Sequence, residues 1–234
     1  MQPQRQAFFV ICNIMDIPNK KTQLIATLLE KFKEENEEFL NYAVPNIFSK
    51  KLGSLMLIRE DILLAKDAVN KLIEFKQQRI DEPQIQPDEI IESSLWHSTI
   101  IQYEHCYTEN KGGHSRLEVN EIFTLPADQA YKDTHDEIME LRHSFIAHRD
   151  DTEYEQAVVV MQVPKAGGDD DKIIFGIKSA KTFSPYIDNL SNYIQLFDFL
   201  LPKIDEKIQK QADKTKDGLF KNLDASQINH LLIR

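Results

Sequence analysis

The longest apolar repeat in the chain has the spacing of an α-helix. It runs over residues 49–78, where every third or fourth position carries an apolar side chain. These positions are Leu55, Ile58, Ile62, Ala65, Val69, Leu72 and Phe75. Side chains at this spacing lie on one face of a helix, whereas a strand repeats every second residue. The pattern therefore predicts a long amphipathic helix against which the rest of the fold must pack.

The same spacing predicts further helices on both sides of this stretch. They cover residues 20–42, 89–108, 126–148 and 184–211, with a helical turn at 115–123 and a short terminal helix at 224–234. Asp88 is a favourable N-cap, and Pro126 and Asp128 favour a helix start. We expect the 184–211 helix to end at the KTKDG segment, residues 214–218.

The period changes to that of strands at residues 155–163 and 172–180, which predicts a β-hairpin over 155–180. The expected fold is mainly α: an up-and-down helical bundle with one inserted β-hairpin between the last long helices. We expect one domain spanning residues 1–234.

Composition excludes several functional classes. The chain has only seven glycines and contains neither a dinucleotide-binding nor a P-loop glycine motif. Its net charge of −10 is unlike that of a protein that coats nucleic acid, so any RNA contact must be a local basic site. The apolar run at residues 7–15 is too short to span a bilayer. We therefore expect a cytoplasmic protein without a membrane partner.

Metal and cysteine chemistry are poorly supported by the sequence. Glu140 and His143 form one E-x-x-H pair, but a dimetal site in a helical bundle needs two such pairs and two more glutamates. Cys106 follows His105, yet neighbouring residues on a helix point in different directions. Cys12 and Cys106 are expected to be buried thiols in a reducing compartment. No metal or cofactor is expected.

The segment MELRHSFIAHRDD, residues 139–151, concentrates two histidines and two arginines on a predicted helix. With α-helical spacing, His148 points in nearly the same direction as Leu141, at the margin of the packed face. Arg142 lies one step around the helix and can reach towards the imidazole. A guanidinium binds phosphate with two hydrogen bonds, and a histidine near its pKa can accept and return a proton. These two groups suffice for metal-free RNA cleavage.

A structural interpretation of the same residues is also open. Arg142 would pair with an acidic neighbour such as Asp136 or Glu140, and His148 would be hydrogen-bonded near the helix C-terminus, where cations are favoured. Residue types alone favour this second interpretation.

The stretch LRHSFIAHRD resembles the signature of the HEPN superfamily, in which an arginine and a polar residue precede a histidine a few positions later. Here these are Arg142, His143 and His148. The AHRD ending resembles the abortive-infection and phage-defence branches of that superfamily. Upstream, IIQYEHCYT at 100–108 resembles a segment of such proteins, with His105 where an arginine is expected. The resemblance covers residues 95–150.

The resemblance implies an α-helical bundle that pairs as a homodimer and cleaves RNA without a metal, as a toxin or antiviral defence effector. Arg142 would bind the scissile phosphate, His148 would be the general acid and base, and His143 would orient them. Arg149, His105 and Tyr103 would contact the substrate, although Tyr103 and Tyr107 also fit a packed core. An antitoxin protein would be a further partner. The alternative is a non-catalytic helical module that binds RNA or protein.

Overall fold

The computed structural model describes residues 20–36, 44, 46–86, 88–109, 115–147, 155–162, 174–181 and 184–222. The chain divides into two compact units, one formed by residues 1–49 with 215–234 and the other by residues 50–214. The expectation of a single domain over residues 1–234 stays a prediction. The terminal helix predicted at 224–234 lies outside the described residues.

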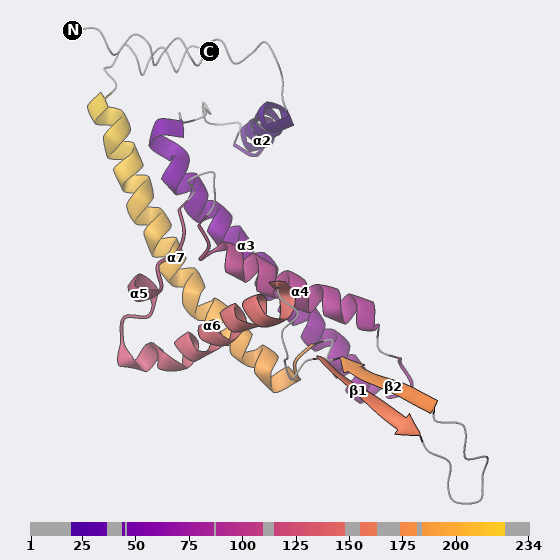
Figure 1. Ribbon diagram of the computed structural model, residues 1–234. Helices are drawn as coiled ribbons and strands as arrows, with labels where there is room; N and C mark the ends of the chain where they lie inside the picture. Colours follow the sequence, from indigo (N-terminus) through magenta and orange to yellow (C-terminus); the bar gives the residue numbers. More distant parts are fainter. Residues whose placement is uncertain are drawn as a thin grey trace, which may run out of the picture. The chain divides into compact units, whose positions relative to one another are not determined.

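The described chain is mainly helical, as the apolar spacing predicts (Figure 1). Its elements are α2 (Lys20–Glu35), α3 (Asn46–Asp81), α4 (Glu89–His105), α5 (Val119–Ile122), η2 (Pro126–Asp128), α6 (Gln129–Leu141), η3 (Arg142–Ala147), β1 (Glu155–Gln162), β2 (Ile174–Lys181) and α7 (Ile187–Asn222). None of the helices in this described part is long and apolar enough to cross a membrane.

The larger unit is organised around the two longest helices, α3 and α7, which are antiparallel. Arg59 Nε lies 2.7 Å from Asp205 Oδ1, and Lys66 Nζ lies 2.5 Å from Asp198 Oδ1. Seven residues forward along α3 therefore correspond to seven residues backward along α7. Both ion pairs bridge the outer edge of a shared apolar core.

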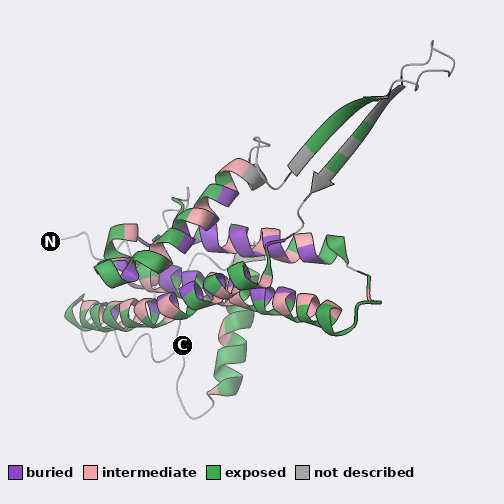
Figure 2. Cartoon of the chain, turned by 90° about the horizontal axis from the view of Figure 1, so that it is seen from below, coloured by how far each residue is buried: buried purple, intermediate pink, exposed green. Residues whose placement is uncertain are grey.

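The core of this unit joins side chains from α3, α4, α6 and α7. Trp96 on α4 and Tyr193 and Phe197 on α7 are completely buried. They pack with the apolar row of α3 predicted from the sequence, which includes Ile62 and Leu72. Figure 2 shows buried segments, in purple, along several of the packed helices. The lone tryptophan of the chain is thus a core residue.

Helix ends agree with their predicted signals in some places and not in others. The Asp88 side chain accepts a hydrogen bond of 3.0 Å from the Ile91 amide and caps α4 as predicted. Helix α7 was expected to end at residues 214–218, but it continues to Asn222. Thr215 Oγ1 donates to the Phe48 carbonyl at 3.2 Å, and Gly218 lies beside the Phe48 ring. This packing overrides the low helix propensity of the glycine.

The hairpin occurs where the strand pattern predicts it. Strands β1 and β2 pair antiparallel, from Glu155 opposite Lys181 to Gln162 opposite Ile174. Val158, Val159, Met161 and Ile177 on these strands are exposed. The residues between the strands lie outside the described part of the chain.

Helix α2 is the main described helix of the smaller unit. It was predicted over residues 20–42 and is described over Lys20–Glu35. The apolar face predicted for it, with Leu24, Leu28 and Phe32, is exposed rather than buried.

Candidate functional site

The predicted catalytic arginine lies where α6 changes into a π-helix. Residues Gln129–Leu141 are α-helical, and η3 (Arg142–Ala147) is a π-helix. A π-helix bonds residue i to i+5, and such segments occur frequently at functional sites. The prediction that His148 points with Leu141 assumed α-helical spacing throughout, and that assumption is wrong over Arg142–Ala147. His148 and Arg149 themselves lie outside the described residues.

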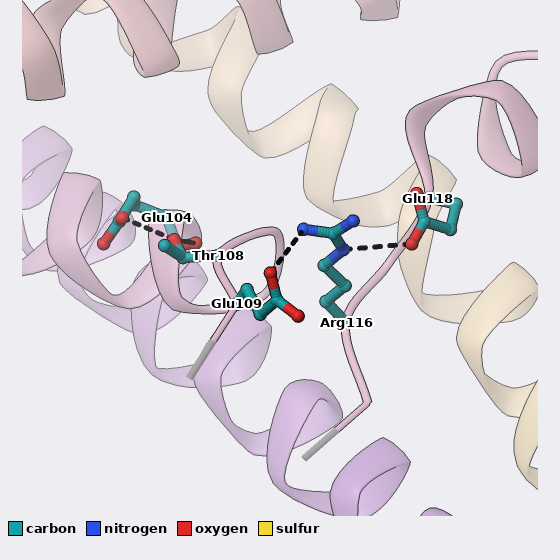
Figure 3. Close-up of polar contacts among 5 residues, drawn as sticks. All are labelled: Glu104, Thr108, Glu109, Arg116 and Glu118. Atoms are coloured by element: carbon teal, nitrogen blue, oxygen red, sulfur yellow. Dashed lines mark hydrogen bonds and ion pairs between the residues drawn. The ribbon is translucent and has the colours of Figure 1, made fainter. Parts of the chain in front are cut away.

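Arg142 has an acidic partner on a neighbouring helix. Its Nε lies 3.4 Å from Oε1 of Glu104 on α4, whose side chain is almost completely buried. The Thr108 hydroxyl also donates to this Glu104 oxygen (Figure 3). Of the two acidic neighbours considered from the sequence, Asp136 pairs with Lys132 instead. Arg142 is therefore held by a contact between helices.

A pocket of about 430 Å³ opens beside this ion pair, and we call it the arginine pocket. Its lining residues are Ser54, Leu57, Ile58, Asp61, Glu104, His105, Thr108, Glu109, Ser115 and Arg142. It brings together two of the predicted site residues, Arg142 and His105. His143 does not line it, and its side chain is exposed.

The arginine pocket is rich in carboxylates. Asp61, Glu104 and Glu109 line it together with one guanidinium and one imidazole. Burial raises the pKa of the Asp61 carboxyl above its usual range, the charge of His105 opposes this, and Glu60 adds to it. A phosphate that enters the pocket must therefore compete with Glu104 for Arg142.

Tyr103 is a packing residue in this structure. It was expected to contact substrate, but its side chain is completely buried. Its hydroxyl lies 2.8 Å from Nδ1 of buried His135 and 3.4 Å from the Tyr107 hydroxyl. Burial raises the pKa of both phenols well above their usual range. Of the two roles that the sequence left open for Tyr103, the structure shows the packed one, because no surface of this side chain is accessible to a ligand.

The described residues do not favour metal or thiolate chemistry. Among them, no group of three or more His, Cys, Asp or Glu side chains is placed to hold a metal ion. Cys106 is buried, and burial raises the pKa of its thiol far above the usual range, which makes it a poor nucleophile. Cys12 lies outside the described residues.

A second, larger pocket adjoins the first and was not predicted from the sequence. Its volume is about 830 Å³, and we call it the lysine pocket. Both pockets are lined by Glu109 and Ser115, so they meet at these residues. The signal that could have found it is the spacing of four lysines on one helix, at positions 203, 207, 210 and 214.

Glu104 was not predicted from the sequence as a site residue. This buried carboxylate opposite Arg142 comes from a helix almost forty residues earlier in the chain, and no local spacing connects the two residues.

Comparison with protein-family models, with curated proteins and with solved structures finds no match for this chain.

Proposed function

We propose that this protein is a metal-independent endoribonuclease of the HEPN type. The observation that carries the proposal is the position of Arg142: a guanidinium with 32% of its side chain exposed, at the start of a π-helix, facing a pocket lined by His105. The HEPN-like order of Arg142, His143 and His148 supplies the rest of the proposal.

In the proposed reaction, Arg142 binds the non-bridging oxygens of the scissile phosphate. His148 removes the proton of the neighbouring 2′-hydroxyl, whose oxygen attacks phosphorus. The bond to the 5′-oxygen breaks, and that oxygen receives a proton from an imidazolium. The products are a 2′,3′-cyclic phosphate and a 5′-hydroxyl. A fixed guanidinium stabilises the negative charge that develops on the phosphate oxygens.

The contact with Glu104 is compatible with this role. The guanidinium has five N–H donors, and the ion pair uses Nε, so the remaining donors can bind a phosphate. Glu104 would then hold the arginine in the position in which it meets the substrate. His143 would orient the phosphate or the base, and His105 and Arg149 would contact the RNA. Tyr103 has no such role in the proposed reaction, because its side chain is buried.

We further propose that two copies of the chain pair and place two motifs across one cleft. The exposed valines and isoleucine of the hairpin support self-association, because contiguous exposed apolar surface marks sites of protein contact. In this proposal the protein acts in the cytoplasm as a toxin or antiviral effector controlled by an antitoxin.

A second candidate function has its own support. The Arg142–Glu104 ion pair is also what a structural arginine would make, and three carboxylates in the pocket oppose phosphate binding. On this alternative the chain is a non-catalytic helical module that binds RNA or protein.

A cleavage assay with EDTA present separates the two candidates. Purified protein is incubated with single-stranded and hairpin RNA, and the Arg142→Ala and His148→Ala variants are compared with wild type. We expect each substitution to lower the rate about 10²–10³-fold, as for the loss of one group that stabilises transition-state charge. Arg59→Ala is the matched control, because its side chain is also 32% exposed and also pairs with an acidic residue on another helix. Wild type and both motif variants equally inert on every RNA would exclude the nuclease.

A further inference from the structure

The lysine pocket gathers basic side chains in an acidic chain. Six cations line it: Lys51, Arg116, Lys203, Lys207, Lys210 and Lys214. Four carboxylates line it as well: Glu109, Glu118, Glu121 and Glu206. The charged lining therefore has a net charge of +2, whereas the chain carries −10. A local excess of positive charge attracts an anion even when the whole molecule repels it.

Four of the six cations form a row on α7. Lys203, Lys207, Lys210 and Lys214 are separated by four, three and four residues, a spacing that places side chains on one helix face. Lys51 on α3 and Arg116 before α5 line the same pocket. An extended row of ammonium groups along a hollow suits a ligand with regularly repeated negative charges, such as a phosphate backbone.

Three of the six cations, Lys207, Lys210 and Arg116, form ion pairs with carboxylates of the same pocket. Lys207 Nζ lies 2.5 Å from Glu121, and Lys210 Nζ lies 2.5 Å from Glu206. Each lysine lowers the pKa of its carboxyl partner, mainly through the hydrogen bond that it donates. Because both carboxylates are exposed to solvent, these pairs are weak. A phosphate can replace such a carboxylate without uncovering a buried charge.

The other three lysines of the pocket, Lys51, Lys203 and Lys214, form no ion pair within 4.0 Å of a carboxylate in the described part of the chain. The ammonium of Lys203 lies over the Phe199 ring, 4.5 Å from its centre. Three cations at the edge of a hollow are thus positioned to bind anions directly.

The two pockets meet at Glu109 and Ser115, so one extended ligand can contact both. Arg116 Nε lies 3.0 Å from Glu118, and its Nη1 lies 4.0 Å from Glu109, which belongs to both pockets (Figure 3). Glu104 and Thr108 of the arginine pocket lie on the other side of Glu109 in the same view. A chain of phosphates could therefore extend from the lysine pocket past Arg116 towards Arg142.

We propose that the lysine pocket binds the sugar-phosphate backbone of a single RNA strand whose scissile phosphate lies at Arg142. This inference rests on the proposed ribonuclease function. Among the described residues that line the pocket, none is aromatic and could stack on a base, so binding through them depends on phosphate charge and tolerates any sequence. A hollow of this volume between helices admits one strand more readily than the wide surface of a duplex.

The test measures binding of fluorescein-labelled oligouridylate as a function of salt, with EDTA present, in the Arg142→Ala background so that RNA stays intact. Lys51→Gln/Lys203→Gln/Lys214→Gln is compared with Lys50→Gln/Lys71→Gln/Lys132→Gln, which changes the charge equally at lysines outside the pocket. Each phosphate contact contributes about 0.7 to the slope of log Kobs against log salt for a single strand. We expect the pocket variant to lose about 2 from this slope, and the control variant to retain it.

A second variant, which should tighten RNA binding, controls for the possibility that the triple variant binds weakly because it is misfolded. Glu121→Gln removes the carboxylate that occupies Lys207, so it should tighten binding and steepen the slope by about 0.7. Equal slopes for the pocket and control triples, or no tightening by Glu121→Gln, would overturn the proposal. So would preferential displacement of the RNA by poly-glutamate, because the pocket would then be a site for acidic protein segments.

The same variants separate this inference from the ribonuclease function. If the slope depends on the three lysines but no RNA is cleaved by protein with Arg142 intact, the backbone site stands and the nuclease does not. If RNA is cleaved and the triple variant has an unchanged KM, the nuclease stands and the backbone site does not.

Discussion

A buried carboxylate, Glu92, connects three parts of the larger unit and gives the sharpest stability prediction. Only 6% of its side chain is exposed. Its Oε1 lies 2.9 Å from Arg79 Nη2, and its Oε2 lies 3.8 Å from Lys76 Nζ and 3.3 Å from the Ser184 hydroxyl. Arg79 and Lys76 belong to α3, Glu92 to α4, and Ser184 precedes α7. Helix α7 begins at Ile187, although the sequence predicts a start at Ser184.

We expect Glu92→Ala to destabilise the protein by about 3 kcal/mol. At an effective dielectric constant of about 20, each of the two charge contacts is worth about 4–6 kcal/mol before desolvation is counted. Desolvating the carboxylate offsets several kcal/mol of this, and breaking a buried pair costs about 3–5 kcal/mol in other proteins. Arg79 and Lys76 retain some contact with solvent, which places the cost at the lower end.

Urea titration and thermal melting, followed by far-UV circular dichroism, measure this effect. A loss of 3 kcal/mol lowers Tm by about 6–12 °C for a domain of this size. Glu74→Ala is the matched control, because Glu74 also pairs with an α3 lysine, Lys71, but at the surface. The control should cost less than about 1 kcal/mol. Equal free energies of unfolding for the two variants would show that the Glu92 cluster does not hold these helices together.

Two further predictions concern a histidine and a glycine. Burial lowers the pKa of His135 below its usual 6.5, with Asp136 raising it and Lys132 lowering it. The unfolded chain therefore binds more protons below pH about 6.5, and the free energy of unfolding should fall there by up to about 1.4 kcal/mol per pH unit. Urea titrations from pH 5 to 8 should show this loss in wild type and less of it in His135→Asn; parallel profiles would contradict it. Gly53 lies inside α3, and a Cβ added there would have no neighbouring atom within 4 Å. Gly53→Ala should therefore raise the free energy of unfolding by about 0.5–1 kcal/mol. A destabilised variant in the same titration would show that this space is filled.

Local patterns were sufficient to predict where the long helices and the hairpin lie. The apolar row of α3 and the Asp88 cap are properties of neighbouring residues, and the structure confirms both. The end of α7 could not be predicted in this way, because Thr215 and Gly218 remain helical through their contacts with Phe48, which lies far away in the sequence. A propensity argument cannot include such a contact.

The candidate site was harder to predict than the fold. The motif located Arg142, but its partner Glu104 comes from another helix, and the π-helix at Arg142–Ala147 departs from the α-helical spacing on which the prediction was based. Tyr103 has the right residue type for contact with RNA, yet its hydroxyl bonds to His135 in the core. Helical spacing predicts which residues share the face of α4 that carries Tyr103. It does not predict whether other helices bury that face.

In the proposed reaction, Arg142 and His148 cleave RNA by attack of the 2′-hydroxyl, without a metal. Analysis of the cleavage products with EDTA present tests it most directly. We expect 2′,3′-cyclic phosphate and 5′-hydroxyl ends, and no cleavage at a position where one 2′-deoxynucleotide replaces the ribonucleotide. Cleavage at that 2′-deoxy position, or cleavage that requires added Mg²⁺, would contradict it.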